Sequence, residues 1–114
     1  MNVLIAYESS GTVREAFRKL GHQAWSCDLQ PADDGSIYHL TMDAKKAIRE
    51  TTVRLGHWDL IIMHPPCTAL CVSGNAHYGT GKPKHDQRLE AIEYTLEMFE
   101  LAKKCSESVC MENP

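Results

Sequence analysis

The sequence predicts a single α/β domain organised around a mostly parallel β-sheet. The clearest sign is the aliphatic run Leu60–Met63, which has the length and composition of a strand buried on both faces of such a sheet. A second sign is the amino terminus, where the apolar stretch Asn2–Ala6 is followed by a turn and a helical pattern, the opening of a βαβ unit. The third is length, because 114 residues suffice for one core and leave little room for a second domain.

Strand-like and helix-like segments alternate along the rest of the chain. Ser9, Ser10 or Thr12 can cap the first helix, and Gly21 is well placed to end it. We expect strands at Asn2–Ala6, Gln23–Cys27, Ile37–Leu40, Leu60–Met63 and Ser108–Met111, and helices over about 13–20, 44–55 and 84–104. The last helix should be amphipathic, with apolar residues at Leu89, Ile92, Leu96, Phe99 and Leu101.

Composition narrows the function classes. The net charge of −3 and the scattered Lys and Arg residues give no global basic field of the kind found in many nucleic-acid binders, so any DNA contact needs a local patch. The five cysteines come without a signal peptide or an apolar run long enough to span a bilayer. We therefore expect a reduced, cytoplasmic protein without a membrane partner rather than a disulfide framework.

A candidate nucleophile, Cys67, follows the central apolar run. Pro65 and Pro66 lie between that run and the cysteine, and two consecutive prolines make a stiff, non-helical exit from a strand. Cys67 would then lie just beyond the carboxyl end of a strand, where open α/β sheets bind ligands. The alternative is a turn followed by a buried, inert cysteine, since free cysteines are commonly buried.

Acidic residues near the ends of the first two strands suggest a nucleotide-like ligand. Backbone N–H groups after the turn Glu8–Gly11 could approach such a ligand closely, although one glycine is a weak motif. Asp28 follows the second strand at the spacing where dinucleotide-binding folds hold ribose hydroxyls. Asp43 precedes a helix. Helix or turn capping is the structural alternative for both aspartates.

Taken together, three short motifs resemble the DNA cytosine-5 methyltransferase family. They are Pro65-Pro66-Cys67 after one strand, Ser73-Gly74 a few residues later, and Glu112-Asn113 after the next strand. The resemblance covers nearly the whole chain. It implies a Rossmann-like three-layer sandwich with a mostly parallel sheet of about five strands in the order 3-2-1-4-5. It also implies transfer of a methyl group from S-adenosylmethionine to C5 of cytosine in DNA.

The resemblance also implies roles for individual residues. Cys67 would be the nucleophile that adds to C6 of the base, and Glu112 the acid that holds the base. Asp28 falls at the family's ribose-binding acid and Asp43 at its adenine-contacting aspartate. The cofactor-binding set would be Tyr7, Glu8, Ser9, Ser10, Gly11, Asp28, Leu29, Asp43 and Pro65, and the substrate-binding set Pro66, Ser73, Gly74 and Asn113.

The chain also departs from the family pattern. The glycine-rich first motif is thinned, Ile5 stands near the usual acidic position of the first strand, and His64 stands where the family tends to have a small or aromatic residue. The sequence ends at Pro114, so we expect a domain truncated after its fifth strand: a fragment, a split enzyme or a remnant. A second chain or a homo-oligomer would cover the open sheet edge.

Three other functions remain open. Amino-methyltransferases that act on adenine N6 or cytosine N4 carry Pro-Pro followed by an aromatic residue, a position that Cys67 occupies here. A non-catalytic domain could keep the fold and bind only the cofactor or a partner. Metal binding is the third, because Cys67, Cys71, Cys105, Cys110 and six histidines supply ligands, although their spacings fit common zinc motifs poorly.

Overall fold

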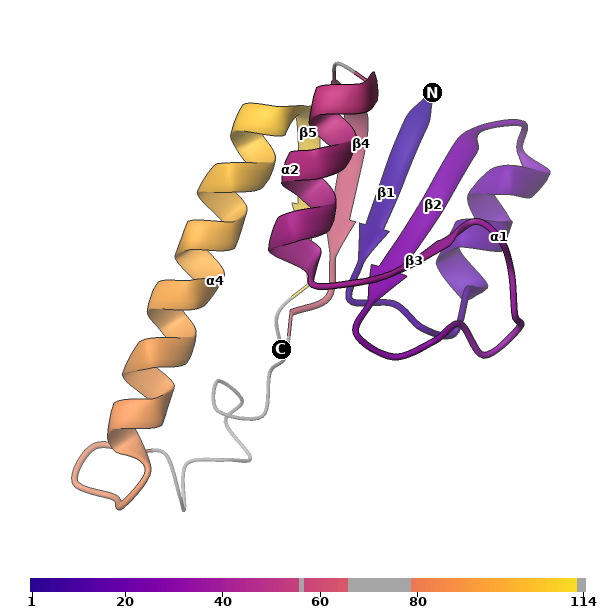
Figure 1. Cartoon of the computed structure of the whole chain (residues 1–114). Coiled ribbons are helices and arrows are strands. Elements are labelled where there is room, and N and C mark those ends of the chain that lie inside the picture. Colours follow the sequence, from indigo (N-terminus) through magenta and orange to yellow (C-terminus); the bar gives the residue numbers. More distant parts are fainter. Residues whose placement is uncertain (56, 66–78, 113–114) are drawn as a thin grey trace.

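The computed structural model describes residues 1–55, 57–65 and 79–112 and has the predicted α/β fold (Figure 1). Five parallel strands form one sheet in the order β3-β2-β1-β4-β5, with helices on both faces. The strands are β1 (Asn2–Ala6), β2 (Gln23–Asp28), β3 (His39–Thr41), β4 (Trp58–Met63) and β5 (Ser106–Met111). The helices are α1 (Thr12–Lys19), α2 (Ala44–Leu55) and α4 (His85–Cys105). The Rossmann-like sheet order is therefore confirmed.

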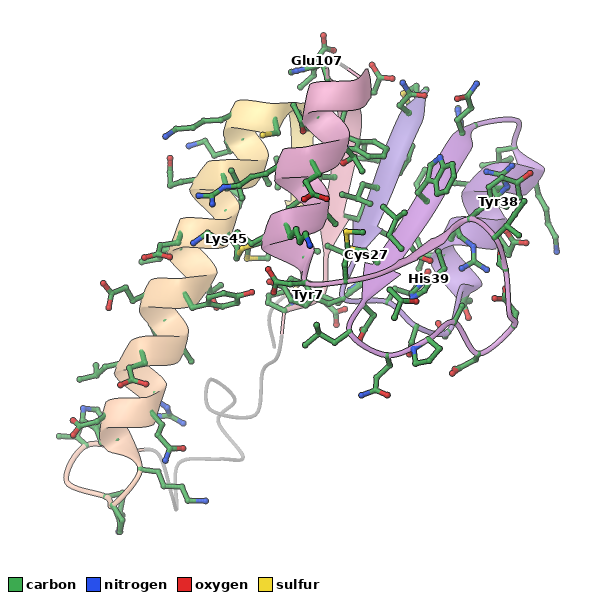
Figure 2. All side chains as sticks on the ribbon, viewed as in Figure 1. Tyr7, Cys27, Tyr38, His39, Lys45 and Glu107 are labelled. Atoms are coloured by element: carbon green, nitrogen blue, oxygen red, sulfur yellow. The ribbon has the colours of Figure 1, made fainter. Side chains whose placement is uncertain are left out.

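The central strand β1 is apolar throughout because both of its faces are covered. Val3 and Ile5 belong to a cluster with Phe17 of α1, whereas Leu4 belongs to a cluster with Ile48 of α2 and helix α4. Successive side chains of a strand point to opposite faces, so these two clusters form the two cores of a three-layer arrangement. Figure 2 shows side chains filling the space between the sheet and α2.

Helix α4 packs through a different face from the one that its largest apolar residues predict. Its buried residues are Thr95, Met98 and Ala102, whereas Leu89, Ile92 and Leu96 are 52%, 42% and 60% exposed. Because α4 has 21 residues, it spans about 31 Å, longer than a strand of six residues at about 20 Å. Its amino-terminal half extends past the ends of the strands (Figure 1), so Leu89 and Ile92 lie along a part of the helix with no described strand beneath it. Leu96, further along the helix, lines a groove between α4 and α2.

The third strand begins two residues later than predicted. Ile37 is 79% exposed, and the first strand residue is His39. The ring of Tyr38 lies edge-on to Trp25, with ring centroids 5.4 Å apart, and the guanidinium carbon of Arg18 lies 3.3 Å from its centroid. These contacts hold Tyr38 against α1 and β2, and the chain joins the sheet only after it.

Candidate functional site

A cavity of about 380 Å³ opens where the carboxyl ends of the central strands meet. Tyr7 follows β1, Asp28 ends β2 and His64 follows β4, so three neighbouring strands deliver side chains to one place. The lining residues are Tyr7, Asp28, Leu29, Asp43, Ala44, His64 and Tyr94. Ligands of open α/β sheets bind at this edge, and the volume lies within the range of small-molecule sites. Four of the lining residues, Tyr7, Asp28, Leu29 and Asp43, are in the predicted cofactor set.

Two tyrosines form one wall of this cavity. The hydroxyl oxygens of Tyr7 and Tyr94 are 2.6 Å apart, which joins the end of β1 to helix α4. Burial and this hydrogen bond raise the pKa of Tyr7 far above its ordinary value, so its phenol stays protonated. Tyr7 also has a φ of 64°, in the left-handed region that residues other than glycine seldom occupy. The sequence pattern gave no signal for Tyr94, because only the packing of α4 brings it to the strand ends.

Asp28 and Asp43 both face the cavity and both also fix the local backbone. Oδ1 of Asp28 accepts a hydrogen bond from the Gln30 N–H at 2.9 Å, and Oδ2 of Asp43 accepts one from the Lys46 N–H at 3.3 Å. The capping alternative is therefore correct for Asp43 at the start of α2. Capping uses one oxygen of each carboxylate, and the cavity position leaves the groups available for a hydroxyl or amino ligand.

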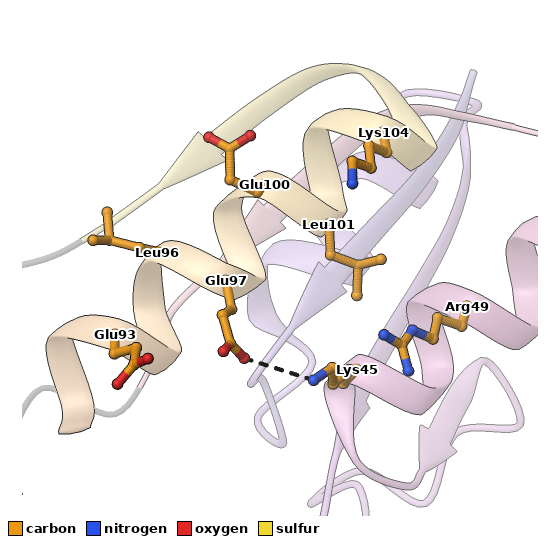
Figure 3. Close-up of a pocket in the computed structure, with 8 residues that line it drawn as sticks. All are labelled: Lys45, Arg49, Glu93, Leu96, Glu97, Glu100, Leu101 and Lys104. Atoms are coloured by element: carbon orange, nitrogen blue, oxygen red, sulfur yellow. Dashed lines mark ion pairs between the residues drawn. The ribbon is translucent and has the colours of Figure 1, made fainter.

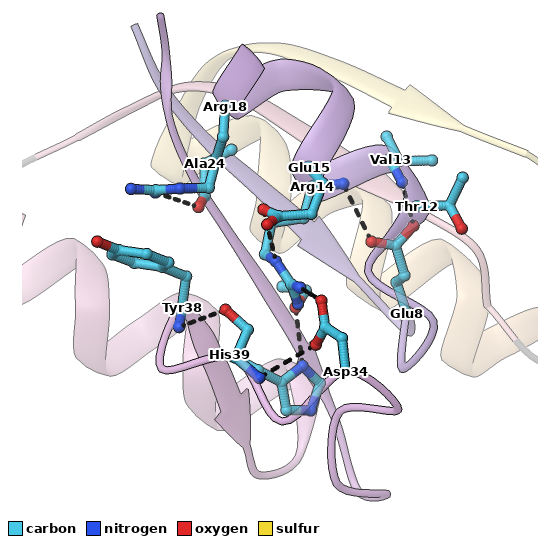
Figure 4. Close-up of polar contacts among 12 residues, drawn as sticks. Glu8, Thr12, Val13, Arg14, Glu15, Arg18, Ala24, Asp34, Tyr38 and His39 are labelled. Carbon is cyan, nitrogen blue, oxygen red and sulfur yellow. Dashed lines mark hydrogen bonds and ion pairs between the residues drawn. The ribbon is translucent and has the colours of Figure 1, made fainter.

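The turn Glu8–Gly11 supports α1 instead of lining the cavity. Glu8 is buried, and its two carboxylate oxygens accept hydrogen bonds from the N–H groups of Val13 and Arg14 at 3.1 and 3.2 Å (Figure 4). The Ser10 hydroxyl accepts one from the Thr12 N–H at 3.3 Å. The expectation that these helix N–H groups approach a ligand is thus wrong for Val13 and Arg14, because a carboxylate of the chain already occupies them.

Arg14 anchors a polar network beside this turn. Its side chain is fully buried, donates to Ser26 Oγ at 2.8 Å and forms a short ion pair with Asp34 (Figure 4). Ser26 also bonds Nδ1 of His39 at 2.7 Å. Gly11 is required here because a Cβ atom on it would lie 2.5 Å from Arg14 Nη2, and its φ is 79°. The network ties the segment between β2 and β3 to α1.

His64 and Glu112 lie side by side at the ends of β4 and β5. Nδ1 of His64 is 2.9 Å from Oε2 of Glu112, and the backbone N–H of Glu112 donates to the Met63 carbonyl at 3.0 Å. The Glu112 side chain is 72% exposed, so its carboxylate is open to a ligand. Because His64 also lines the cavity, the predicted acid lies next to the candidate cofactor site.

Several predicted site residues lie outside the described part of the chain. They are the nucleophile Cys67 and the substrate-binding residues Pro66, Ser73, Gly74 and Asn113. Pro65 is described and is buried, and it does not line the cavity. Ser9, whose carbonyl accepts a hydrogen bond from the Asp33 N–H at 2.9 Å, does not line it either.

Cys27, the described cysteine nearest the candidate site, has an unreactive thiol. It is buried at the end of β2, and burial raises the pKa of its thiol to about 12. The carboxylates of Asp28 and Asp43 raise the pKa further, whereas a backbone hydrogen bond at Tyr7 lowers it. A protonated, buried thiol is a poor nucleophile, so Cys27 is an unsuitable catalytic residue.

At about pH 8, folded protein treated with iodoacetamide should be alkylated at the exposed Cys110 and spared at Cys27, as measured by peptide mass spectrometry. In concentrated urea both cysteines should react. Because folding raises the pKa of Cys27, its contribution to the free energy of unfolding is present below about pH 9 and is lost as the pH rises towards 12. Equal labelling of the two cysteines in folded protein would contradict this assignment.

A second, larger groove of about 540 Å³ lies between α2 and α4 (Figure 3). It is lined mainly by long charged side chains, and Lys45 and Glu97 form an ion pair of 3.7 Å across it. These side chains are 37% and 57% exposed, so the pair contributes little to stability. The groove is lined by residues of the two helices alone, whereas the smaller cavity includes residues at the ends of β1, β2 and β4. We therefore take the smaller cavity as the candidate site despite its size.

No family model, curated protein or solved structure matches this chain. The resemblance to cytosine-5 methyltransferases thus stays a prediction from the quoted motifs. Among residues 1–55, 57–65 and 79–112, His, Cys, Asp and Glu side chains form no group of three or more that could hold a metal ion. Over the same ranges, each helix is too short or too polar to cross a lipid bilayer.

Proposed function

We propose that the chain is the catalytic domain, or part of it, of an S-adenosylmethionine-dependent DNA cytosine-5 methyltransferase. The observation that carries this proposal is the shared edge of the sheet. A cavity with two carboxylates, Asp28 and Asp43, adjoins the exposed carboxylate of Glu112 through the ring of His64. This arrangement provides neighbouring sites for a cofactor and for a base.

The cavity suits a nucleoside without phosphate groups. Asp28 and Asp43 can accept hydrogen bonds from ribose hydroxyls and an adenine amino group, and Tyr7 and Tyr94 offer aromatic surface. Pyrophosphate-containing dinucleotides usually place their phosphates on the N–H groups of the first helix. Here Glu8 occupies two of those N–H groups and would repel an anion. S-adenosylmethionine carries no phosphate, so this carboxylate does not obstruct it.

Two side chains of this chain would carry the chemistry. The thiolate of Cys67 adds to C6 of cytosine, which makes C5 nucleophilic, and the carboxylic acid of Glu112 donates a hydrogen bond to N3 as charge develops on the ring. The bound cofactor supplies the electrophilic methyl group. Transfer of the C5 proton to water acting as the base would then break the bond between sulfur and C6 and return the thiolate. A cytosine in duplex DNA would have to leave the base stack to reach the site.

Covalent trapping tests this proposal directly. Random-sequence duplexes with 5-fluorocytosine at each cytosine remove the need to know the target sequence, and fluorine at C5 prevents release of the thiolate. Wild-type protein with S-adenosylmethionine should form an adduct that survives denaturing electrophoresis, and Cys67→Ala should abolish it. Cys110→Ala, which removes an exposed cysteine from β5, is the matched control and should trap like wild type. A folded wild-type protein that forms no adduct would contradict the proposal.

A non-catalytic, partner-binding domain is the second candidate. It is favoured by the position of β5 at the edge of the sheet. Among the described residues no strand pairs with the outer edge of β5, so the backbone groups on that edge are open to a partner chain. Leu60 and Ile62 are only half-buried on the face that α1 covers elsewhere. Calorimetric titration with S-adenosylmethionine, alone and with DNA, separates the candidates: no heat from either would favour the non-catalytic domain.

A further inference from the structure

The contact between His64 and Glu112 has no counterpart in the predicted site, which includes Glu112 but not His64. Both residues follow strand ends that are fixed by backbone hydrogen bonds: the His64 N–H donates to the Ala6 carbonyl at 3.1 Å, and the Glu112 N–H donates to the Met63 carbonyl at 3.0 Å. His64 also precedes the buried Pro65, which further restricts its backbone. The sheet therefore fixes the backbone from which the imidazole extends.

Glu112 has no such restraint of its own. Its side chain has three rotatable bonds and is 72% exposed, so it would sample several rotamers without a partner. An ionised carboxylate only accepts hydrogen bonds, and a carboxylic acid that carries its proton on Oε1 still accepts through Oε2. In both states the 2.9 Å contact has Nδ1 of His64 as the donor and Oε2 as the acceptor. Oε1 is left for a ligand.

We infer that His64 is a positioning residue that holds Oε2 of Glu112 and so directs Oε1 towards the target base. This inference rests on the proposed function, because it assigns the base-binding role to Glu112. The other titratable groups that line the same cavity are Tyr7, Asp28, Asp43 and Tyr94. In the described part of the chain, none of them forms a hydrogen bond with the His64 ring.

Two amide substitutions test which of the two ring nitrogens makes the contact with Glu112. In asparagine the amide nitrogen is three bonds from Cα, as Nδ1 is in histidine, so His64→Asn can still donate to Oε2. In glutamine the nitrogen lies one bond further out, nearer the position of Nε2, so His64→Gln cannot reproduce the contact. His64→Ala removes it altogether. The three variants keep a small or polar side chain at a position that is about one-third exposed in the wild type.

The first measurement is the rate of adduct formation with the random-sequence 5-fluorocytosine duplexes over a range of DNA concentrations. His64→Ala and His64→Gln should lower the rate at saturating DNA about tenfold while the half-saturating DNA concentration changes little. His64→Asn should recover the wild-type rate to within about threefold. If the ring had a merely structural role, asparagine would not restore the trapping rate any better than alanine or glutamine does.

The second measurement needs no DNA. Long-range ¹H–¹⁵N spectra of the imidazoles at about pH 8 should show the proton of the neutral His64 ring on Nδ1, and Glu112→Ala should release this preference. Equal trapping by wild type and His64→Ala, or a His64 proton on Nε2, overturns the inference and leaves the proposed function standing. If the wild type forms no adduct, the proposed function and the base-directed role both fail, while the spectra still decide whether the pair forms.

Discussion

Replacing Glu112 with alanine should slow covalent trapping of 5-fluorocytosine DNA by about a hundredfold. The reason is that thiolate addition to C6 builds negative charge on the ring, and the acid hydrogen-bonded at N3 stabilises that charge most in the transition state. Glu112→Gln should be less severe, because an amide N–H can still donate to N3 but cannot give up its proton. The measurement is the single-turnover rate of adduct formation at saturating DNA.

Glu107 provides the matched control for this prediction. It lies on β5, the strand that Glu112 follows, and is exposed, but it is near the opposite end of the strand from Glu112 (Figure 2). Glu107→Ala should leave the trapping rate within about twofold of wild type, since surface substitutions away from a site have small effects. Trapping by Glu112→Ala at a rate within about threefold of wild type would show that Glu112 does not hold the base.

Replacing Asp34 with alanine should lower the free energy of unfolding by about 3 kcal/mol. Asp34 supplies the negative charge beside the Arg14 guanidinium, which is fully buried. Without it, Arg14 keeps the Ser26 hydroxyl at 2.8 Å and one ion pair of 3.5 Å with Glu15. The Glu15 side chain is 47% exposed, so this longer pair compensates the buried charge only in part. The change should be measured as a shift in the urea midpoint at constant slope.

Removing the cation should cost less than removing its partner. Arg14→Met keeps an apolar side chain of similar length in the buried space, and the Asp34 carboxylate that it leaves behind is 38% exposed and can be hydrated. We expect a loss of about 1 kcal/mol. Asp33→Ala, at the neighbouring exposed aspartate, is the matched control and should stay within about 0.5 kcal/mol of wild type. An Asp34→Ala protein as stable as Asp33→Ala would refute the assignment.

The sheet was predictable because each strand carries its own local signal. The apolar start at Asn2–Ala6 marks a strand that is buried on both faces. The aliphatic run at Leu60–Met63 marks a strand that is buried on one face and half-buried on the other, and such apolar runs need no long-range information to be recognised. The boundaries of α2 were equally clear, since a capping aspartate precedes it. The packing face of α4 was not predictable, because the helix is longer than the strands and leaves Leu89 and Ile92 exposed.

The candidate site was predictable only in part. Asp28 follows a spacing rule and Asp43 was placed by the family resemblance, and the sheet order brings them to one cavity. Glu8 belongs to the turn predicted to hold the cofactor and yet serves α1, because the sequence does not say which way a side chain turns. Tyr94 and His64 enter the site through tertiary packing alone: one from the body of a helix, the other as the neighbour of a glutamate 48 residues away.

Strand β1 is synthesised before the other strands of the sheet, but it gains its second neighbouring strand late. One of its neighbours, β2, follows within a few tens of residues, whereas the other pairs Val3 with Leu60 and forms only after α2 has been made. Until then, one row of β1 backbone N–H and C=O groups has no strand to bond, and such a row can pair with another chain. A nascent or partly unfolded form would therefore expose one edge of its most apolar strand, β1, until β4 pairs with that edge.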